Sequence, residues 1–524
     1  MATRKPKTPA KAAKTQQPAA LPKPARRASA VTNRYDVTSG ENADGGRVRR
    51  PAHIEFGGEE SVLRPFERLK AISLVRDLMR NSAPMRGLDR TLRTNIVGPC
   101  GKLRFRDPGD WYTKAAKWFN GTWGQSADFT DGSTWRECLQ LAVHSLSFDG
   151  DFIVIFDDGL LSGGKGTGKL CFFEADRICN LDKASFEPFK KKGMSQDSGI
   201  LYDKIGRKCG VIVAASPGLT ETSADKALIL TCKPDDPKHE RNWLHVMRKF
   251  RLRQGRGIPD AVTAAPTALD SLEILGLEMQ SAKMGAAKYA AVFEKEPADA
   301  ALAGLVPPPD PDKENGEGGE DAQDDGEDWH SPALESITGG NVDYLKEGDK
   351  VEFTPTNRPN PNLAAFLDYA SDVYGAAFGV SHAYARLKAD TSYTAFRGDL
   401  AMTWKVFEDF QQFIEDAFTD WVARRAIEHA IAVGTLTAPP TGDWHEGIAW
   451  QYPAQPSVDE GREATATATK LKNGLTTYRD TLGPNWRETL ENIAEEIEYC
   501  KKLGIPHPAL ETASGAVIQT EGNQ

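Results

Sequence analysis

The segment that decides the fold is residues 255–294, GRGIPDAVTAAPTALDSLEILGLEMQSAKMGAAKYAAVFE. After the glycines and Pro259, small and apolar side chains recur every three or four residues, which is typical of an amphipathic helix. The recurring positions are Ile258, Val262, Ala265, Leu269, Leu272, Gly276, Met279, Ala282 and Ala286. The spacing predicts one long helix over 260–294, spanning about 50 Å at 1.5 Å per residue. Its striped face needs a surface to bury against, and neighbouring copies of the chain could supply one.

Two further striped helices are predicted downstream. The first follows Pro361 and ends at Gly379, with Phe366 and Val373 among the apolar residues on one face. The second begins at Tyr393 and carries an aromatic stripe, which is far more typical of a packing face than of a base-stacking platform. The stripe consists of Phe396, Leu400, Trp404, Phe407, Phe410, Ile414, Phe418 and Trp421.

The region before the long helix is predicted to be mixed α+β with a core of its own. Helical spacing of apolar residues runs from near Ser61 to Asn81, over 85–97 and over 134–147. Two β-rich runs at 151–156 and 170–173 flank a glycine-rich turn and predict a hairpin. Short apolar runs at 200–202 and 211–214 add strands to the same region.

The C-terminus is predicted to be a small helical unit. Ser457 and Glu460 have the S-x-x-E spacing of a capping box, and Gly474 closes the helix that follows. Pro484 opens another helix that runs to Leu503. A strand is also expected at 351–353, between the long helix and the second one.

Charge is distributed unevenly along the chain. The first 50 residues hold twelve Lys or Arg against three acidic residues, so this arm carries +9 and the remainder −18 of the net −9. Its composition predicts disorder, and contact with nucleic acid or a scaffold is the alternative. An acidic, Gly-rich run at 310–328 predicts a mobile insertion. The acidic body argues against tight binding of nucleic acid by phosphate neutralisation.

Composition excludes several classes of protein. A chain of 524 residues, 40% hydrophobic and 27% charged with mean hydropathy −0.49, is expected to form roughly two to four globular domains. The most apolar stretch, 261–277, already contains Asp270 and Glu273, so no membrane span is predicted. The seven cysteines include no C-x-x-C pair, which argues against a disulfide framework or a zinc site and favours synthesis in a reducing cytoplasm.

A glycine-rich run, GGKGTGK at 163–169, has the spacing of a phosphate-binding P-loop. The position that should hold magnesium is Leu170, and the residues after it read as a strand rather than a helix. A hairpin turn is therefore the favoured interpretation.

Two other enzyme-like patterns are also rejected. Ser381 lies in a segment that approaches a hydrolase G-x-S-x-G elbow, but it follows a helix instead of a strand. Asp310 and its acidic neighbours resemble a calcium loop, but Asn315 stands where glycine is needed. No H-E-x-x-H pair exists, so neither catalytic residues nor metal ligands are assigned. Residue patterns alone thus indicate a non-enzymatic, helix-rich assembly protein.

The order of several local motifs resembles the lambda-type portal proteins of tailed bacteriophages, from about residue 63 to 504. The motifs are Arg76–Asn81, Asn95–Gly98, Asp131–Trp135, Asp149–Phe152, Arg253–Pro259, Leu345–Phe353, Gly379–Ser381 and Ser392–Arg397. Within Leu345–Phe353, Glu347 stands where that family usually has proline.

The resemblance implies an α+β, helix-rich portal fold with wing, stem, clip and crown, assembled as a ring of usually twelve subunits. The implied parts follow the chain in order. They are a basic disordered arm (1–60), wing (61–256), stem helix (257–294), clip (295–358) with a mobile acidic insertion (307–330), second stem helix (359–380), tunnel loop (381–392), wing helix and return (393–456), helical crown (457–505) and flexible tail (506–524).

The resemblance also implies roles for particular side chains. Arg386, Lys388 and Arg397 are expected to contact DNA in the channel, whereas without the resemblance they would be read as ordinary surface charges. A packing face between subunits is expected on the two stem helices. It comprises Val262, Leu269, Leu272, Met279, Phe366 and Val373.

The implied function is a DNA channel at one capsid vertex, with no catalytic centre and no cofactor. The implied partners are double-stranded DNA, the terminase large subunit, head-tail adaptor or neck proteins, and major capsid and scaffold proteins, with no membrane. The implied location is the virion, reached from the host cytoplasm during assembly. The alternative is a capsid-associated structural or scaffold protein without a channel.

Overall fold

The computed structural model describes residues 63–99, 101–106, 109–233, 240–286, 290–293, 342–345, 362–388, 392–483 and 486–507. The basic arm, the acidic insertion, the expected strand at 351–353 and residues 508–524 lie outside them. The described chain is α+β and rich in helix, as predicted.

The first helices form as the apolar spacing predicts. Helix α2 spans Pro65–Asn81 and α3 spans Ala83–Ile96, and both bury most of their apolar stripe, although Phe66 in the first turn of α2 is 69% exposed. Helix α5 spans Trp135–His144, where a capping box formed by Thr134 and Glu137 fixes its start. The predicted helix to residue 147 instead widens into a π-turn, Ser145–Asp149, ahead of the first central strand.

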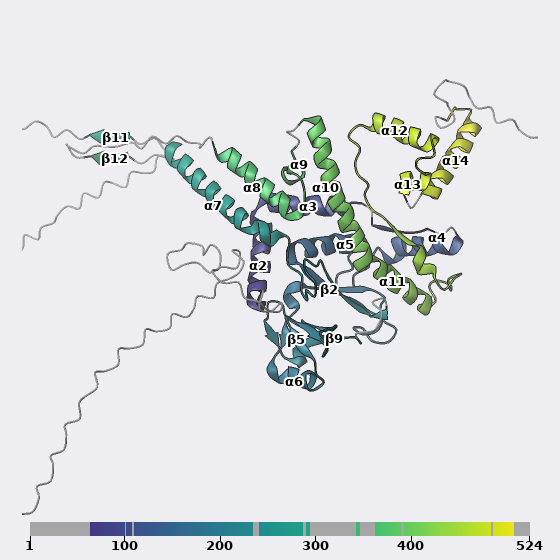
Figure 1. Cartoon of the computed structure of the whole chain (residues 1–524), viewed down its shortest axis with the longest axis horizontal. Helices are drawn as coiled ribbons and strands as arrows, with labels where there is room; N and C mark the ends of the chain where they lie inside the picture. Colours follow the sequence, from purple (N-terminus) through teal and green to yellow (C-terminus); the bar gives the residue numbers. More distant parts are fainter. Residues whose placement is uncertain are drawn as a thin grey trace, which may run out of the picture.

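Two antiparallel sheets follow (Figure 1). The first has the order β10–β2–β3, built from Trp243–Met247, Asp151–Phe156 and Leu170–Glu174. Phe156 pairs with Leu170, which confirms the predicted hairpin. The second has the order β5–β6–β7–β9. Its strands are Ser195–Asp197, Ile200–Tyr202, Lys208–Ala214 and Ala227–Thr231.

The prediction that the region before the long helix has a core of its own is confirmed in part. Two hydrophobic clusters, one around Ile153 and Val211 and one around Leu181 and Ile212, lie wholly within that region, but its helices share a larger core with the rest of the chain. One continuous hydrophobic core joins residues of α2, α3 and α5 to residues from the second half of the chain. That half contributes α10 (Tyr393–Ile414), a π-turn (Glu415–Thr419) and α11 (Asp420–Val433). It also contributes β13 (Ile448–Gln451), which pairs antiparallel with β1 (Lys102–Phe105). The aromatic stripe of α10 and α11 faces this core, so its interpretation as a packing face is confirmed.

The long helix is shorter than predicted. Helix α7 spans Ala261–Ala286, and the last part of the predicted helix is instead strand β11 (Ala290–Phe293). That strand pairs in parallel with β12 (Val342–Leu345), and such long-range pairing is not visible in a local apolar spacing. Helix α8 (Leu363–Phe378) packs along α7, where the Tyr374 hydroxyl lies 2.8 Å from the Ser271 hydroxyl oxygen.

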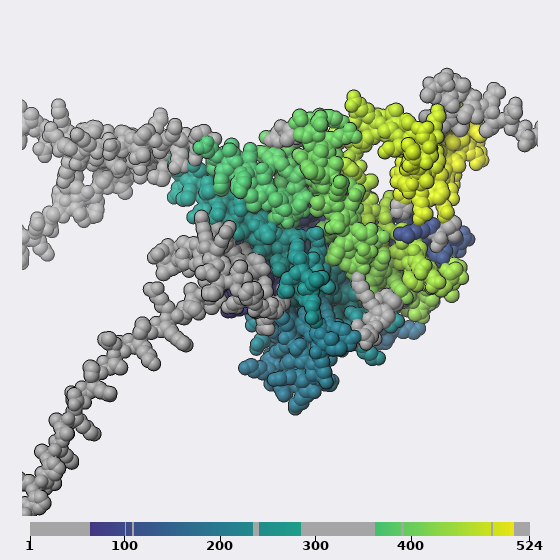
Figure 2. Space-filling model, viewed as in Figure 1, coloured from purple at the N-terminus to yellow at the C-terminus, as the bar shows by residue number. Residues whose placement is uncertain are grey.

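The C-terminal unit contains α12 (Glu460–Lys472), α13 (Tyr478–Leu482) and α14 (Trp486–Leu503). Asp459 caps α12, because its side chain accepts a hydrogen bond from the backbone amide of Arg462. The prediction of a capping box that begins at Ser457 is therefore wrong. Gly474 follows the end of α12 as predicted. In the space-filling view these helices form a separate lobe (Figure 2).

Among the described residues, the sequence patterns missed four short helices. These are α4 (Asp110–Lys117), α6 (Lys183–Lys191), α9 (His382–Arg386) and α13. Among the described helices, none is both long and apolar enough to cross a membrane.

Candidate functional site

The start of α7 is held by a buried ion pair between two segments far apart in sequence. Arg256 donates from Nε to Asp151 Oδ2 at 2.7 Å and from Nη2 to Oδ1 at 3.1 Å. The same guanidinium donates to three backbone carbonyls, those of Ala175, Ile178 and Ser198. Both side chains of the pair are 1% exposed. Every donor of Arg256 is thus satisfied without water, which is the condition for burying such a charge.

Asp151 collects two further hydrogen bonds. The Gly257 amide and His245 Nε2 both donate to Oδ2, each at 2.9 Å. Burial alone would raise the pKa of Asp151, but the charge of Arg256 and the hydrogen bond from His245 hold it far below its usual range. The carboxylate is therefore a fixed anion that joins strands β2 and β10 to the segment entering α7.

Glycines allow these segments to approach closely. A Cβ on Gly257 would lie 1.9 Å from the carbonyl oxygen of Gly150. Gly150 has φ +95, and a Cβ there would lie 2.8 Å from the Pro259 nitrogen. Both glycines are required by space, and Gly150 also by its backbone conformation.

Arg76 ties α2 to the same region. It lies 2.9 Å from both Asp149 and Asp176 and 3.1 Å from Glu174. Burial would lower the pKa of Arg76, but the hydrogen bond and charge of Asp149, with the other two carboxylates, raise it above its ordinary value. Three of the motifs quoted from the sequence, around Arg76, Asp149 and Arg256, therefore meet at one joint, which we call the α7 joint.

The glycine-rich run at 163–169 encloses a carboxylate of its own chain. Asp157 accepts backbone amides of Gly159, Leu161, Ser162 and Thr167 at 2.9–3.2 Å, as well as the hydroxyls of Ser162 and Thr167. Burial opposes ionisation, but these bonds, led by that of the Ser162 hydroxyl, hold the pKa of Asp157 well below its usual range. The loop then enters strand β3, which agrees with a hairpin turn and not with a P-loop.

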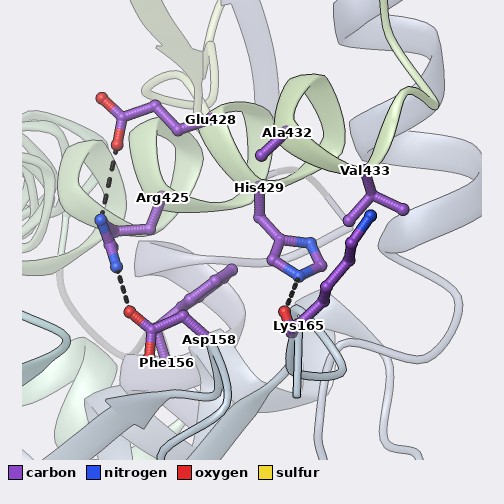
Figure 3. Close-up of a pocket in the computed structure, with 8 residues that line it drawn as sticks. All are labelled: Phe156, Asp158, Lys165, Arg425, Glu428, His429, Ala432 and Val433. Atoms are coloured by element: carbon purple, nitrogen blue, oxygen red, sulfur yellow. Dashed lines mark hydrogen bonds and ion pairs between the residues drawn. The ribbon is translucent and has the colours of Figure 1, made fainter.

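The outer side of this loop borders a cavity of about 400 Å³ against α11 (Figure 3). Arg425 bridges Asp158 at 2.7 Å and Glu428 at 3.7 Å, and His429 Nε2 lies 3.0 Å from the carbonyl oxygen of Lys165. These contacts fasten the loop to the helix. Charged groups at the cavity wall are thus largely paired with one another, which leaves no cluster of donors directed at a ligand.

The expected loop at 381–392 contains helix α9. Gly379, at φ +69, ends α8 in a Schellman motif in which the Val380 amide donates to Gly375 at 2.9 Å. The amide of Ser381 then donates to the hydroxyl of Thr403 at 2.9 Å. Ser381 thus follows a helix, as predicted, and does not form a nucleophile elbow after a strand, whereas the helix that it caps was not predicted.

The three residues expected to contact DNA have different surroundings. Arg386 pairs with Asp368 on α8 at 2.7 Å, with its side chain 19% exposed. Lys388 is exposed next to the end of α9, and Arg397 is half-exposed on α10, 3.5 Å from Glu463. Arg386 is accordingly part of the link between α9 and α8, whereas Lys388 and Arg397 are more open to solvent.

The six residues of the expected subunit-packing face also divide by position. Val262 is buried within the single chain, and Leu269 and Leu272 pack partly against its core. Met279 is 58% exposed, and Phe366 and Val373 are half-buried. The first half of α7 is therefore committed to the body, and only its outer half offers a surface.

Comparison with protein families matches residues 57–411 to the family described as phage portal protein, lambda family. The chain belongs to the lambda family of phage portal proteins. The match runs from just before α2 to the last turn of α10, so it includes the whole α7 joint. Family membership implies a structural protein of the phage capsid that forms a homo-oligomeric ring. A search of curated proteins returned no match.

Some polar residues of this portal protein were not identified from the sequence. Asp157 and His245 lie in ordinary strand-end and strand positions, and only their three-dimensional neighbours distinguish them. An aspartate a few residues before a glycine-rich run is a weak signal for a loop that closes on a carboxylate. Among the described residues, no group of three or more His, Cys, Asp or Glu side chains is placed to hold a metal ion.

Proposed function

We propose that the chain forms the ring-shaped DNA channel at one capsid vertex, through which the genome enters during packaging and leaves during ejection. Terminase docks on this ring during packaging, and neck or tail proteins dock afterwards. Major capsid and scaffold proteins contact it during assembly in the host cytoplasm. The proposal rests on the family match together with the surface of α7 and α8.

The observation that carries the proposal is the apolar surface of the α7–α8 arm. Leu277 and Met279 on α7 are 59% and 58% exposed, and Tyr369 on α8 is 65% exposed. The arm extends beyond the body (Figures 1 and 2). Large apolar side chains exposed on an arm that leaves the body favour burial against another molecule, and in a closed ring each arm would meet the arms of its neighbours.

Within this ring we assign α7 and α8 to the stem and the strands β11 and β12 to the clip. The α+β body with α10 and α11 forms the wing, and α12–α14 the crown. Residues 381–392 form the tunnel loop. Lys388 and Arg397 then contact passing phosphates through screened, replaceable interactions, and Arg386 adds positive charge while holding α9 against Asp368.

Electron microscopy of the purified full-length protein tests the ring. We expect annular particles with a central hole, and the double variant Leu277→Asp/Met279→Asp should shift the population to monomers. The matched control is Leu475→Asp, which changes a residue that is also exposed but lies outside the arm. Particles without a hole would instead support the capsid-associated or scaffold alternative. Rings formed by the double variant would show that the arm is not part of the subunit interface.

Phage complementation tests the channel contacts. Arg386→Ala with Lys388→Ala should leave rings intact but lower the amount of packaged or retained DNA, and Arg397→Ala should act in the same direction. Lys190→Ala, an exposed change on α6, is the control. Normal filling and retention in virions carrying the site variants would contradict the assignment.

A further inference from the structure

A second cavity, of about 580 Å³, lies beside the α7 joint and is lined mainly by cations. Its lysines and arginines come from three separate places in the chain, which are strand β7, the segment just before β10, and the loop after β10. They are Lys208, Arg241, Lys249, Arg251 and Arg253, and the acidic residue among the described lining is Asp197. This excess of positive charge contrasts with the net charge of −9 of the whole chain.

The backbone is distorted to place one of these cations. Arg253 has φ +60, a conformation that non-glycine residues rarely adopt. Its Nη2 donates to the carbonyl of Ile205 at 3.2 Å, and a Cβ on Gly206 would lie 2.6 Å from the same nitrogen. Strained backbone of this kind is concentrated at sites where a side chain must be held in one place.

Lys208 connects the cavity to the α7 joint. His245 donates from Nε2 to Asp151, so its Nδ1 is the acceptor for the Lys208 ammonium, with which it is in hydrogen-bond contact. Burial lowers the pKa of Lys208 to about 7, and the charges of Arg256 and Lys249 act in the same direction against the opposing effect of Asp151. Burial, aided by Lys208, likewise lowers the pKa of His245 to about 4, so His245 is neutral at pH 7. In the described lining, the lysines and arginines outnumber the single carboxylate, that of Asp197.

We propose that this cavity is a binding site for a tetrahedral oxyanion, such as the phosphate group of a small molecule or of a nucleic acid. Lys208 lies at the wall nearest the joint, and Lys249 and Arg253 lie in the exposed loop, so the anion enters between β7 and that loop. Arginine and lysine together suit a doubly charged oxyanion, because it can accept hydrogen bonds from the planar guanidinium group of arginine and from the ammonium group of lysine. The site is independent of the DNA channel, and ring formation does not depend on it.

Sulfate is the sharpest probe because its charge does not change near neutral pH. Thermal unfolding of the purified full-length protein is followed against sulfate concentration at constant ionic strength with chloride, and affinity is obtained from the linkage between ligand and stability. We expect sulfate to bind about tenfold more tightly at pH 6 than at pH 8, because binding favours the protonated form of Lys208. Lys208→Met should remove this dependence on pH.

Variants of the exposed cations test the geometry without entering the core. Lys249→Ala with Arg253→Gly should weaken sulfate binding at least about tenfold, as expected for the loss of charge-assisted hydrogen bonds. Glycine at 253 also suits the positive φ, so this variant is expected to fold. Lys190→Ala is the matched control and should bind sulfate normally.

A competing ligand identifies the source of the oxyanion. Displacement of sulfate by inorganic phosphate but not by a short DNA duplex supports a small-molecule phosphate, and displacement by both supports a nucleic acid backbone. The proposal is overturned if sulfate stabilises the protein no more than chloride does, or if the double variant and the control bind it equally. Binding of an acidic peptide without binding of sulfate would also overturn it, in favour of a protein partner.

Discussion

Replacing Arg256 with methionine is expected to lower the free energy of unfolding by about 3–5 kcal/mol, because it leaves a buried carboxylate without its counter-charge. The structure gives the reason for the size of this effect. Asp151 is 1% exposed and would keep only the bonds from Gly257 and His245. Three carbonyls that now accept from Arg256 would also lose their donor. Arg256→Lys should not restore stability, because an ammonium cannot reproduce the planar fork.

Urea unfolding at fixed protein concentration measures the effect. The exposed pair of Arg462 and Asp459, with the arginine side chain 82% exposed, provides the control. Arg462→Met is expected to change stability by less than about 0.5 kcal/mol. The double variant Arg256→Met/Asp151→Asn should be more stable than Arg256→Met alone, because it removes the unpaired charge. A loss below about 1 kcal/mol in Arg256→Met, or a double variant that is no more stable, would refute this account of the α7 joint.

Four further outcomes are expected. Purified protein should not hydrolyse ATP, because a carboxylate of the chain already fills the glycine-rich loop; turnover abolished by Lys169→Ala would contradict this. Gly257→Ala should abolish soluble expression, since a Cβ there lies 1.9 Å from a backbone oxygen, whereas Gly276→Ala, with nothing within 4 Å, should be tolerated. Burial and neighbouring carboxylates raise the pKa of Glu415 to about 7, so its contribution to stability is present below about pH 4.5 and is lost as the pH rises through 7. Urea unfolding at pH 5 and pH 8 should therefore show that the free energy of unfolding falls by about 1–2 kcal/mol less in Glu415→Gln than in the parent protein, after allowance for the partial exposure of Glu415. Deletion of 307–330, which is highly charged and poor in apolar residues, should leave rings visible by electron microscopy.

Local periodicity predicted the elements that local contacts determine. The helices around Val75 and Trp404 and the hairpin at Phe156 follow from apolar spacing and turn residues, and the structure confirms them. Features that depend on distant partners were not predictable in this way. Strand β11 continues a helical pattern but pairs with β12, about fifty residues later in the chain, and β1 finds its partner β13 only near the C-terminus. The prediction of a core confined to the first region holds only for the clusters around Ile153 and Leu181, because the aromatic face of α10 completes the largest core.

The candidate site shows the same division. The motif containing Arg256 and Gly257 was identified from the sequence, and its place before the long helix was predicted. The sequence did not indicate that Arg256 reaches back to Asp151, since an arginine with no visible partner is normally exposed. The residues expected to contact DNA were located on their elements, but the pairing of Arg386 with Asp368 depends on how α8 and α9 pack.

The use of an ion pair at the α7 joint follows from the length of the helix that it holds. An apolar pair of similar volume could stabilise the fold as well, but it could not make the directed hydrogen bonds that hold the segment before α7 in place. Helix α7 has 26 residues and extends about 39 Å from the joint. A tilt of about 10° at its start would move the far end by about 7 Å at that length. Such a shift exceeds the tolerance of packed side chains, so in the ring that we propose, arms with unfixed directions would not meet their neighbours. The hydrogen bonds from Arg256 and Gly257 to Asp151 fix the segment that enters α7, and the buried residues of its first half pack against the core, so the two together set the direction in which the arm leaves the body.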